Sequence, residues 1–293
     1  MPKIGQAHGI NAREMINRSI AFYQKMFAHT CKMDWETVRT IAKDWQGISD
    51  SAETALINIL ILNIRTEIAF GMFNDGCTNL YWKTKGNTFL AQNWDWMEDQ
   101  KQNLIILDIV NDKIPRIKMV TEAGIIGKIG LNELGVGVCL NAIKVPGCDT
   151  TRIPVHLALR LVLESSSANH AVQQLEKVGL AASAHLLIGD KEKALGLKSS
   201  AKTMMFITED ERGQILHANH LLLQHEGSVD AGWLADSPCR QRRIQELATM
   251  YGVSTDREPC MMLFVCWMIM MDFRIRFVGM RRAPWDWMRR SLV

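Results

Sequence analysis

A glycine followed by a cysteine, Gly76-Cys77, could do covalent chemistry on its own backbone. Glycine adopts backbone conformations that other residues resist, so the Cys77 thiol can reach and attack the Gly76 carbonyl carbon. Hydrolysis of the resulting thioester would free the Cys77 α-amine, whose ordinary pKa of about 7.7–8 suits a general base at neutral pH. These two residues alone favour a plainer alternative, a buried structural cysteine after a turn glycine.

Three histidines in one short stretch, His217, His220 and His225, are candidate metal ligands. A zinc site would need a further ligand and hydrogen bonds that hold the ligands in place. The seven cysteines also lack the paired spacing of a zinc site. Because the first residues lack the basic and apolar segments of a secretory signal, we expect reduced thiols.

The predicted secondary structure changes at Gly76-Cys77, from helical before this pair to β-rich after it. The first 76 residues carry helical periodicity in three stretches, Ala12–Met26, Trp35–Trp45 and Ser51–Phe70. From residue 77 the chain contains short β-rich runs separated by turn residues, then two helical stretches, then β-rich runs again. This order predicts stacked sheets flanked by helices rather than an alternating parallel fold. The predicted strands are Thr88–Gln92, Leu104–Val110, Ile117–Thr121, Ile125–Ile129, Gly135–Leu140, Ala184–Gly189, Ala194–Leu197, Met204–Thr208 and Ile215–Ala218, and the two helices are Pro154–Ser165 and Ala168–Val178.

Bulk properties exclude some classes of partner. The net charge of +3 is too small to indicate nucleic acid or an anionic membrane surface. The longest apolar run near the end, Met261–Met271, is shorter than the roughly 20 residues that span a bilayer. We therefore expect neither nucleic acid nor membrane as a partner.

The last 38 residues, 256–293, differ from the rest because methionine and tryptophan crowd there without period. Tryptophan and methionine each have a single codon, so the nucleotides that encode Trp267-Met268 and Met270-Met271 are known. Reading each pair from the third base of its first codon gives a codon for aspartate. Further on, the shifted frame permits Pro-x-Ser-Ile-Cys-Arg. We interpret 256–293 as an aberrant, out-of-frame tail and expect the chain as printed to fold poorly.

Several ordered motifs resemble the fungal acyl-coenzyme A:6-aminopenicillanic acid acyltransferase (isopenicillin N acyltransferase) family, which is peptidase C45-like. The resemblance runs in order from about Ile4 to Leu247, and the shifted frame of the tail also resembles the family. The motifs are Asp75-Gly76-Cys77-Thr78, Gln92-Asn93-Trp94-Asp95, Thr121-Glu122-Ala123-Gly124-Ile125-Ile126-Gly127-Lys128, Ala181-Ala182-Ser183-Ala184, Asn219-His220 and Leu222-Leu223-Gln224-His225.

The resemblance implies an α+β fold of the N-terminal-nucleophile class, two sheets sandwiched between helices, here incomplete at its C-terminus. It implies self-cleavage between Gly76 and Cys77 into a small subunit, 1–76, and a large one whose catalytic core is 77–255. Cys77 would then be the nucleophile. Asp95 would orient the Cys77 amine and substrate, and the Asn219 amide would stabilise the oxyanion.

Two further positions carry over less directly. Ser200 falls where the family has a functionally important serine, although the flanking residues differ and position 198 is a lysine. Asn79 stands where the penicillin enzyme has a threonine, and it can still hydrogen-bond Asp95. The family arginine that would partner Asp95 belongs to the missing C-terminal part. The family is metal-free, so we expect no metal at the three histidines.

The implied activity is acyl transfer from acyl-coenzyme A, a substrate rather than a cofactor, to a 6-aminopenicillanic acid-like amine. Two alternatives stay open. The chain could be an enzyme that hydrolyses a small amide, or a truncated, frameshifted remnant of the family without catalytic activity. Partners would be the acyl donor, the amine acceptor and the two subunits of one chain. Family members often end in a peroxisomal tripeptide, which Ser291-Leu292-Val293 does not match. We expect a cytoplasmic or peroxisomal location, with any signal lost in the altered tail.

Overall fold

The computed structural model describes residues 11–29, 54–69, 76–84, 87–226, 229–230, 232, 234–252 and 275–280. The predicted helix Trp35–Trp45 lies outside these residues. Most of the tail interpreted as out of frame also lies outside them, and its described part forms one strand, β11 (Ile275–Met280). The hypothesis of a shifted frame stays a prediction.

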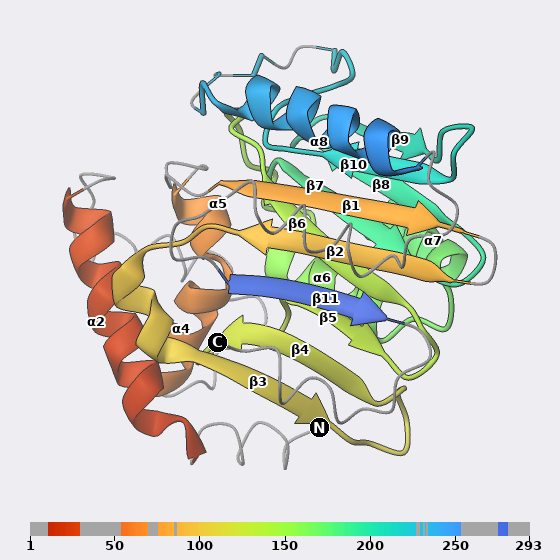
Figure 1. Cartoon of the computed structure of the whole chain (residues 1–293). Coiled ribbons are helices and arrows are strands. Elements are labelled where there is room, and N and C mark those ends of the chain that lie inside the picture. Colours follow the sequence, from red (N-terminus) through yellow and green to blue (C-terminus); the bar gives the residue numbers. More distant parts are fainter. Residues whose placement is uncertain are drawn as a thin grey trace.

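Two antiparallel sheets stack against each other (Figure 1). The smaller sheet has the strand order β10-β1-β2-β11, and the larger has the order β3-β4-β5-β6-β7-β8-β9. Strands β1 and β2 of the smaller sheet lie against β6 of the larger one. The other strands are β1 (Cys77–Lys83), β2 (Thr88–Trp94), β3 (Leu104–Ile109), β4 (Ile117–Glu122), β5 (Ile129–Asn132), β6 (Gly137–Ala142), β7 (Ala184–Gly189), β8 (Ala194–Ser199), β9 (Met204–Thr208) and β10 (Gln214–His217).

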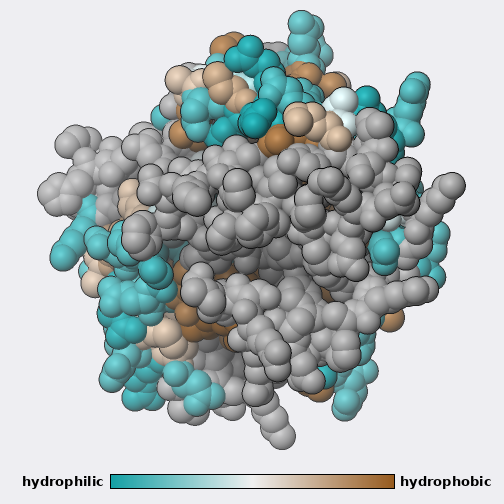
Figure 2. All heavy atoms as spheres, viewed as in Figure 1, coloured by the Kyte–Doolittle hydropathy of each residue, from teal (hydrophilic) through white to brown (hydrophobic). Residues whose placement is uncertain are grey.

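Helices cover the outer faces of both sheets. Helices α6 (Val155–Leu163) and α7 (Ala168–Val178) bury their apolar sides against the larger sheet in one continuous core. Helix α8 (Ser237–Gly252) covers the smaller sheet through Ile244, which packs on strands β1 and β2. The surface seen over α8 is mostly hydrophilic (Figure 2). The predicted α+β sandwich of helix, two sheets and helix is therefore confirmed.

The described helices before Cys77 lie together at one side of the sandwich (Figure 1). Helix α2 (Arg13–His29) lies along the 3₁₀ helix η2 (Glu98–Asn103). The predicted single helix Ser51–Phe70 is two helices in the structure, α4 (Thr54–Asn63) and α5 (Arg65–Ala69). Together they bury an apolar cluster made of Tyr23, Ile61, Leu62, Ile64, Ile68, Ala69 and Ile125.

One predicted strand is displaced. The run Ile125–Ile129 was expected to be extended, but β5 begins only at Ile129. Gly124 has a φ of 95°, and the Ile125 N–H donates to the Glu122 carbonyl, so the chain turns here. This turn receives the side chain of Asn63 from helix α4, whose amide nitrogen donates to the Gly124 carbonyl at 2.9 Å.

Among the described helices, none is both long enough and apolar enough to cross a bilayer.

Candidate active site

Cys77 is the first residue of β1 and faces the space between the two sheets. Strand residues alternate, and Asn79 reaches Asn141 on β6 whereas Thr78 reaches Arg240 on α8. The Cys77 side chain therefore shares the inner face with Asn79. It is 1% exposed and packs with Trp94, Val120 and Ile129.

Gly76 and Asp95 lie side by side at the end of the β1–β2 ladder. The Asp95 backbone N–H donates to the Gly76 carbonyl oxygen at 2.8 Å. A Cβ atom added to Gly76 would lie 2.8 Å from the Asp95 carboxylate oxygen Oδ2, closer than real Cβ atoms come. The glycine thus lets the Asp95 carboxylate approach the peptide bond that joins residues 76 and 77.

Asn219, two residues after the end of β10, contacts the backbone nitrogen of Cys77. The Cys77 N–H donates to Asn219 Oδ1 at 2.6 Å. Asn219 Nδ2 donates one hydrogen to the Ala142 carbonyl at 2.9 Å. An amide nitrogen carries two hydrogens, and the oxyanion role predicted for Asn219 would use the second.

Arg240 on helix α8 is a site residue that the sequence analysis missed. Its Nη1 donates to the Cys77 carbonyl at 2.6 Å and to Thr78 Oγ1 at 3.1 Å. Its Nη2 donates to Asn219 Oδ1 at 3.0 Å, and its Nε to Asp236 at 2.7 Å. No strong apolar pattern marks α8, so neither the helix nor this arginine was predicted.

The loop that carries Asn219 is held by buried polar groups. The Asn219 N–H donates to Ser237 Oγ at 2.8 Å, and the Ala218 N–H donates to Gln241 Oε1 at 2.9 Å. Lys198 Nζ donates to the His220 carbonyl at 2.8 Å. Burial lowers the pKa of Lys198 to about 7. Two residues of α8 and one of β8 therefore fix the position of Asn219.

Asn79 and Ser200, the two positions that carry over less directly, have hydrogen-bond partners other than Asp95 in the described structure. The Asn79 side chain donates to Asn141 on β6, because it points between the sheets, whereas Asp95 follows the end of β2. Ser200 lies in the β8–β9 turn, where its Oγ accepts from the Thr203 N–H at 3.0 Å. Its hydrogen bonds to the Lys202 N–H and the Thr203 hydroxyl also lie within that turn, and none of these described bonds joins Ser200 to Cys77.

The three histidines have different polar or ring partners, and the rings of His217 and His220 also stack with their centroids 6.4 Å apart. The His217 ring lies 3.7 Å from that of His185, His220 Nδ1 contacts Ser237 Oγ, and His225 Nδ1 contacts Thr203 Oγ1. Burial holds the pKa of His217 well below its usual value. In the parts of the chain that the structure covers, no group of three or more His, Cys, Asp or Glu side chains could hold a metal ion.

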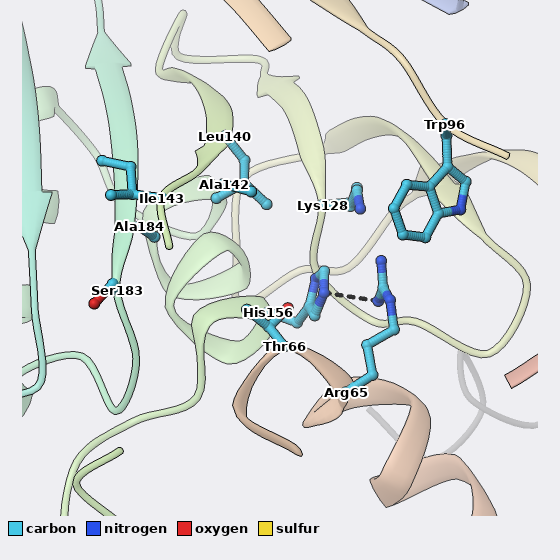
Figure 3. A pocket seen from close by; sticks show the side chains of 10 residues that line it. All are labelled: Arg65, Thr66, Trp96, Lys128, Leu140, Ala142, Ile143, His156, Ser183 and Ala184. Carbon is cyan, nitrogen blue, oxygen red and sulfur yellow. Dashed lines mark hydrogen bonds between the residues drawn. The ribbon is translucent and has the colours of Figure 1, made fainter. Parts of the chain in front are cut away.

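A pocket lies beside the Cys77 cluster (Figure 3). It shares Trp96 and Leu140 with that cluster, and Ala142 joins it to Asn219. In that view Arg65, Lys128 and Trp96 lie on one side, and Leu140, Ala142, Ile143, Ala184 and the hydroxyl-bearing Ser183 lie on the other. The lining residues are Arg65, Thr66, Trp96, Lys128, Leu140, Ala142, Ile143, His156, Ser183 and Ala184.

Behind the polar wall of this pocket lies a buried carboxylate, Glu122. Arg65 Nη2 contacts it at 2.6 Å and Lys128 Nζ at 3.4 Å, and Tyr23 and Trp96 donate to its other oxygen. Burial disfavours its charged form, yet Arg65 and Lys128 hold the pKa of Glu122 below its usual value. These contacts join the helical segment before Cys77 to the sheet core.

Two stacked antiparallel sheets between layers of helices are the architecture of the N-terminal-nucleophile fold. A solved structure of this fold, the Caenorhabditis elegans N-acylethanolamine-hydrolyzing acid amidase ortholog, superposes with a TM-score of 0.58. The match covers 73% of this chain and 98% of that one at 16% identity. Penicillin V acylase from Agrobacterium tumefaciens gives a TM-score of 0.46 at 12% identity, over 65% of this chain and 70% of that one.

The chain belongs to the acyl-coenzyme A:6-aminopenicillanic acid acyl-transferase family, whose sequence model matches residues 82–257. It is 38% identical to the acyl-coenzyme A:6-aminopenicillanic-acid-acyltransferase 40 kDa form of Emericella nidulans over 264 residues. That alignment covers 84% of this chain and 74% of the relative. The family resemblance drawn from the sequence motifs is confirmed.

Proposed function

We propose that the chain cleaves itself between Gly76 and Cys77 and then acts as an acyltransferase through the Cys77 thiol. In the cleavage, Sγ attacks the Gly76 carbonyl carbon and the peptide C–N bond breaks, while the thiol proton passes to the Cys77 nitrogen. Water then hydrolyses the thioester, giving a Gly76 carboxylate and a free thiol. The Asp95 N–H, 2.8 Å from the Gly76 oxygen, would stabilise the charge that develops there.

In turnover, the freed α-amine of Cys77 takes the thiol proton, and Sγ attacks the carbonyl of an acyl thioester. The thiol of the donor leaves, and the acyl group stays on Sγ. A small amine then attacks this acyl-enzyme and releases an amide and the free thiol. Asn219 Oδ1, 2.6 Å from the Cys77 nitrogen, would hold the amine beside its own thiol.

The observation that carries the proposal is the convergence of polar groups on Gly76 and Cys77. Asp95, Asn219 and Arg240 come from three distant parts of the chain, and all contact Gly76 or Cys77. The Asp95 N–H bond continues the β1–β2 ladder, but a structural cysteine after a turn glycine would not need the contacts of Asn219 and Arg240. The matched family supports acyl transfer as the reaction.

The mass of the intact protein tests self-cleavage. Purified wild type should separate under denaturing conditions into two fragments that meet at residues 76 and 77. Cys77→Ala should remain one chain, whereas Cys77→Ser should cleave slowly because a hydroxyl is the weaker nucleophile. A folded wild type that stays uncut would contradict the proposal and favour a non-catalytic relative. A Cys77→Ala protein that still splits there would exclude this thiol.

Acyl transfer and amide hydrolysis are separated by the fate of the acyl group. The cleaved protein would be incubated with a short acyl-coenzyme A, with and without 6-aminopenicillanic acid. Transfer predicts an amide product and faster release of coenzyme A when the amine is present. Release of free acid at a rate that the amine does not change would assign the site to hydrolysis.

A further inference from the structure

The end of strand β6 connects Gln92 of the smaller sheet with Asn219 of the candidate site. The Ala142 carbonyl accepts from Asn219 Nδ2 at 2.9 Å, and Asn219 Oδ1 accepts from the Cys77 N–H at 2.6 Å. Two residues before Ala142, the Leu140 backbone is bonded to the side chain of Gln92. Because Ala142 is one of the groups that orient the Asn219 amide, a shift of β6 would move that amide relative to Cys77.

Gln92, on β2, holds Leu140 by two hydrogen bonds. Its Nε2 donates to the Leu140 carbonyl at 2.6 Å, and its Oε1 accepts from the Leu140 N–H at 2.9 Å. Antiparallel strand residues exchange the same two bonds, an N–H to a carbonyl in each direction. Gln92 is 3% exposed, so water competes little for either bond. This clamp links the two sheets, whose strands β2 and β6 lie against each other.

The β5–β6 ladder ends before it reaches Leu140. Along β6 the described pairs with β5 extend to Val138 and no further, because β5 begins only at Ile129. The Leu140 N–H and carbonyl are therefore left to the Gln92 amide, which takes the place of a strand neighbour. A buried backbone group without a partner is costly, so removal of the amide should let β6 move until these groups find new partners.

We infer that Gln92 is a positioning residue for the reactions at Cys77, acting through β6 and Asn219. The inference rests on the proposed function of Cys77. In the described contacts the Gln92 side chain bonds only Leu140, so its effect reaches Cys77 through Ala142 and Asn219. A displacement of about 1 Å can slow a reaction about 10²-fold. Loss of the clamp should therefore slow self-cleavage in a protein that is still folded.

The rate of self-cleavage in Gln92→Leu measures this effect. We expect the rate to fall at least about tenfold, and kcat for acyl transfer to fall with little change in KM. Asn132→Leu is the matched control, because Asn132 is 1% exposed and its side chain bonds four backbone groups outside the candidate site. Its melting temperature should fall as well, but its folded fraction should cleave at the wild-type rate. Equal falls in rate for the two variants would assign Gln92 to stability alone.

Gln92→Glu keeps the shape of the side chain and makes the clamp depend on pH. A protonated carboxyl can accept from the Leu140 N–H and donate to the Leu140 carbonyl, whereas a carboxylate can only accept. The cleavage rate of Gln92→Glu divided by that of wild type should be close to one at acid pH. This ratio should fall as the acid ionises, above its ordinary pKa of about 4.3 because the position is buried. A ratio that does not change with pH would overturn the inference even if Gln92→Leu fails to fold.

Hydrogen exchange in the uncut Cys77→Ala protein follows the path from Gln92 to Asn219 without activity and without the Cys77 thiol. Adding Gln92→Leu or, at high pH, Gln92→Glu should speed exchange of the backbone amides in 139–143 and in 216–220. Asn132→Leu should change neither segment more than the rest of the two sheets. Faster exchange in 139–143 alone would break the link to Asn219 and overturn the positioning role even if wild type cleaves. A wild type that stays uncut, with both segments affected, overturns the nucleophile and leaves the coupling of Gln92 to Asn219 standing.

Discussion

At the scale of single residues, Arg240 has the most contacts around the proposed cleavage bond. Its guanidinium touches the Cys77 carbonyl, Thr78 and Asn219, and it pairs with Asp236. A planar guanidinium can make these contacts together, whereas a lysine offers a single point charge. Arg240 therefore fixes the conformation of Cys77 relative to the amide of Asn219.

Replacing this arginine should slow self-cleavage without unfolding the protein. We expect Arg240→Met to reduce the rate by about 10²-fold, as for loss of one positioned donor. Arg240→Lys should recover only part of it. Arg243→Met is the control, since Arg243 is exposed on the same helix and pairs only with Glu246 in the described contacts. The fraction of cleaved chain against time after synthesis measures the effect, and equal rates in the two Met variants would refute it.

The residues that meet at the candidate site were predictable where a motif carried them. Gly76, Cys77, Asp95 and Asn219 were all predicted, and the structure brings them together at one bond. Arg240 was not predicted, because its contacts depend on how α8 crosses the smaller sheet, and no local sequence pattern encodes that crossing. Ser200 was assigned from the family resemblance alone, and its side chain takes part in the turn between β8 and β9.

At the scale of elements, the join between α5 and α6 depends on a buried acid. Glu67 on α5 accepts from the N–H of Val155, the first residue of α6, where a helix leaves such donors without an internal partner. Burial raises the pKa of Glu67 from 4.5 to about 7. The folded state therefore holds a proton that the unfolded chain releases above about pH 4.5.

This linkage gives a stability profile with a definite sign. The stabilising contribution of protonated Glu67 is complete below pH 4.5 and is lost as the pH rises through about 7. Glu67→Gln keeps an acceptor for Val155 but cannot ionise. The free energy of unfolding of wild type, relative to Glu67→Gln, should fall by up to about 3 kcal/mol between pH 4.5 and 8. Urea unfolding of both proteins across this range measures it, and parallel profiles would contradict the expectation.

Most strands were predictable as elements because short β-rich runs end at turn residues, as in β4, β7 and β9. Helix α7 was predicted with its limits, and the structure shows why: Ser167 accepts from the His170 N–H at its start, and Gly179 with a φ of 63° ends it. Strand order was not predictable, because pairings such as β1 with β10 join residues more than a hundred positions apart.

At the scale of the whole molecule, the proposed cleavage bond divides the chain between two bodies that share a buried interface. The segment before Cys77 supplies Tyr23 and Arg65 to Glu122, and Glu67 to helix α6. Apolar residues of α2, α4 and α5 pack with Ile125 from the core. Cutting one peptide bond removes none of these contacts, so cleavage should leave the assembly intact.

Asn63 offers a way to test this interface away from the pocket. Its amide donates to the Gly124 carbonyl, and its Oδ1 accepts from the Ile126 N–H at 2.9 Å, both across the interface. Cleaved wild type should elute from a sizing column as one species holding both fragments. Asn63→Leu keeps the size of the side chain and removes both bonds, at a cost of about 1–3 kcal/mol.

The variant should therefore lose its small fragment at a lower urea concentration than wild type. Glu14→Gln, which breaks an exposed pair with Arg18 on α2, is the control and should shift dissociation little, because such pairs contribute about 0.3–0.5 kcal/mol. If the wild-type fragments separate in plain buffer, the contacts at Glu122 and Asn63 are not enough to hold the two fragments together. Composite pockets formed by both fragments, such as the one lined by Arg65 and Lys128, would then be lost on cleavage.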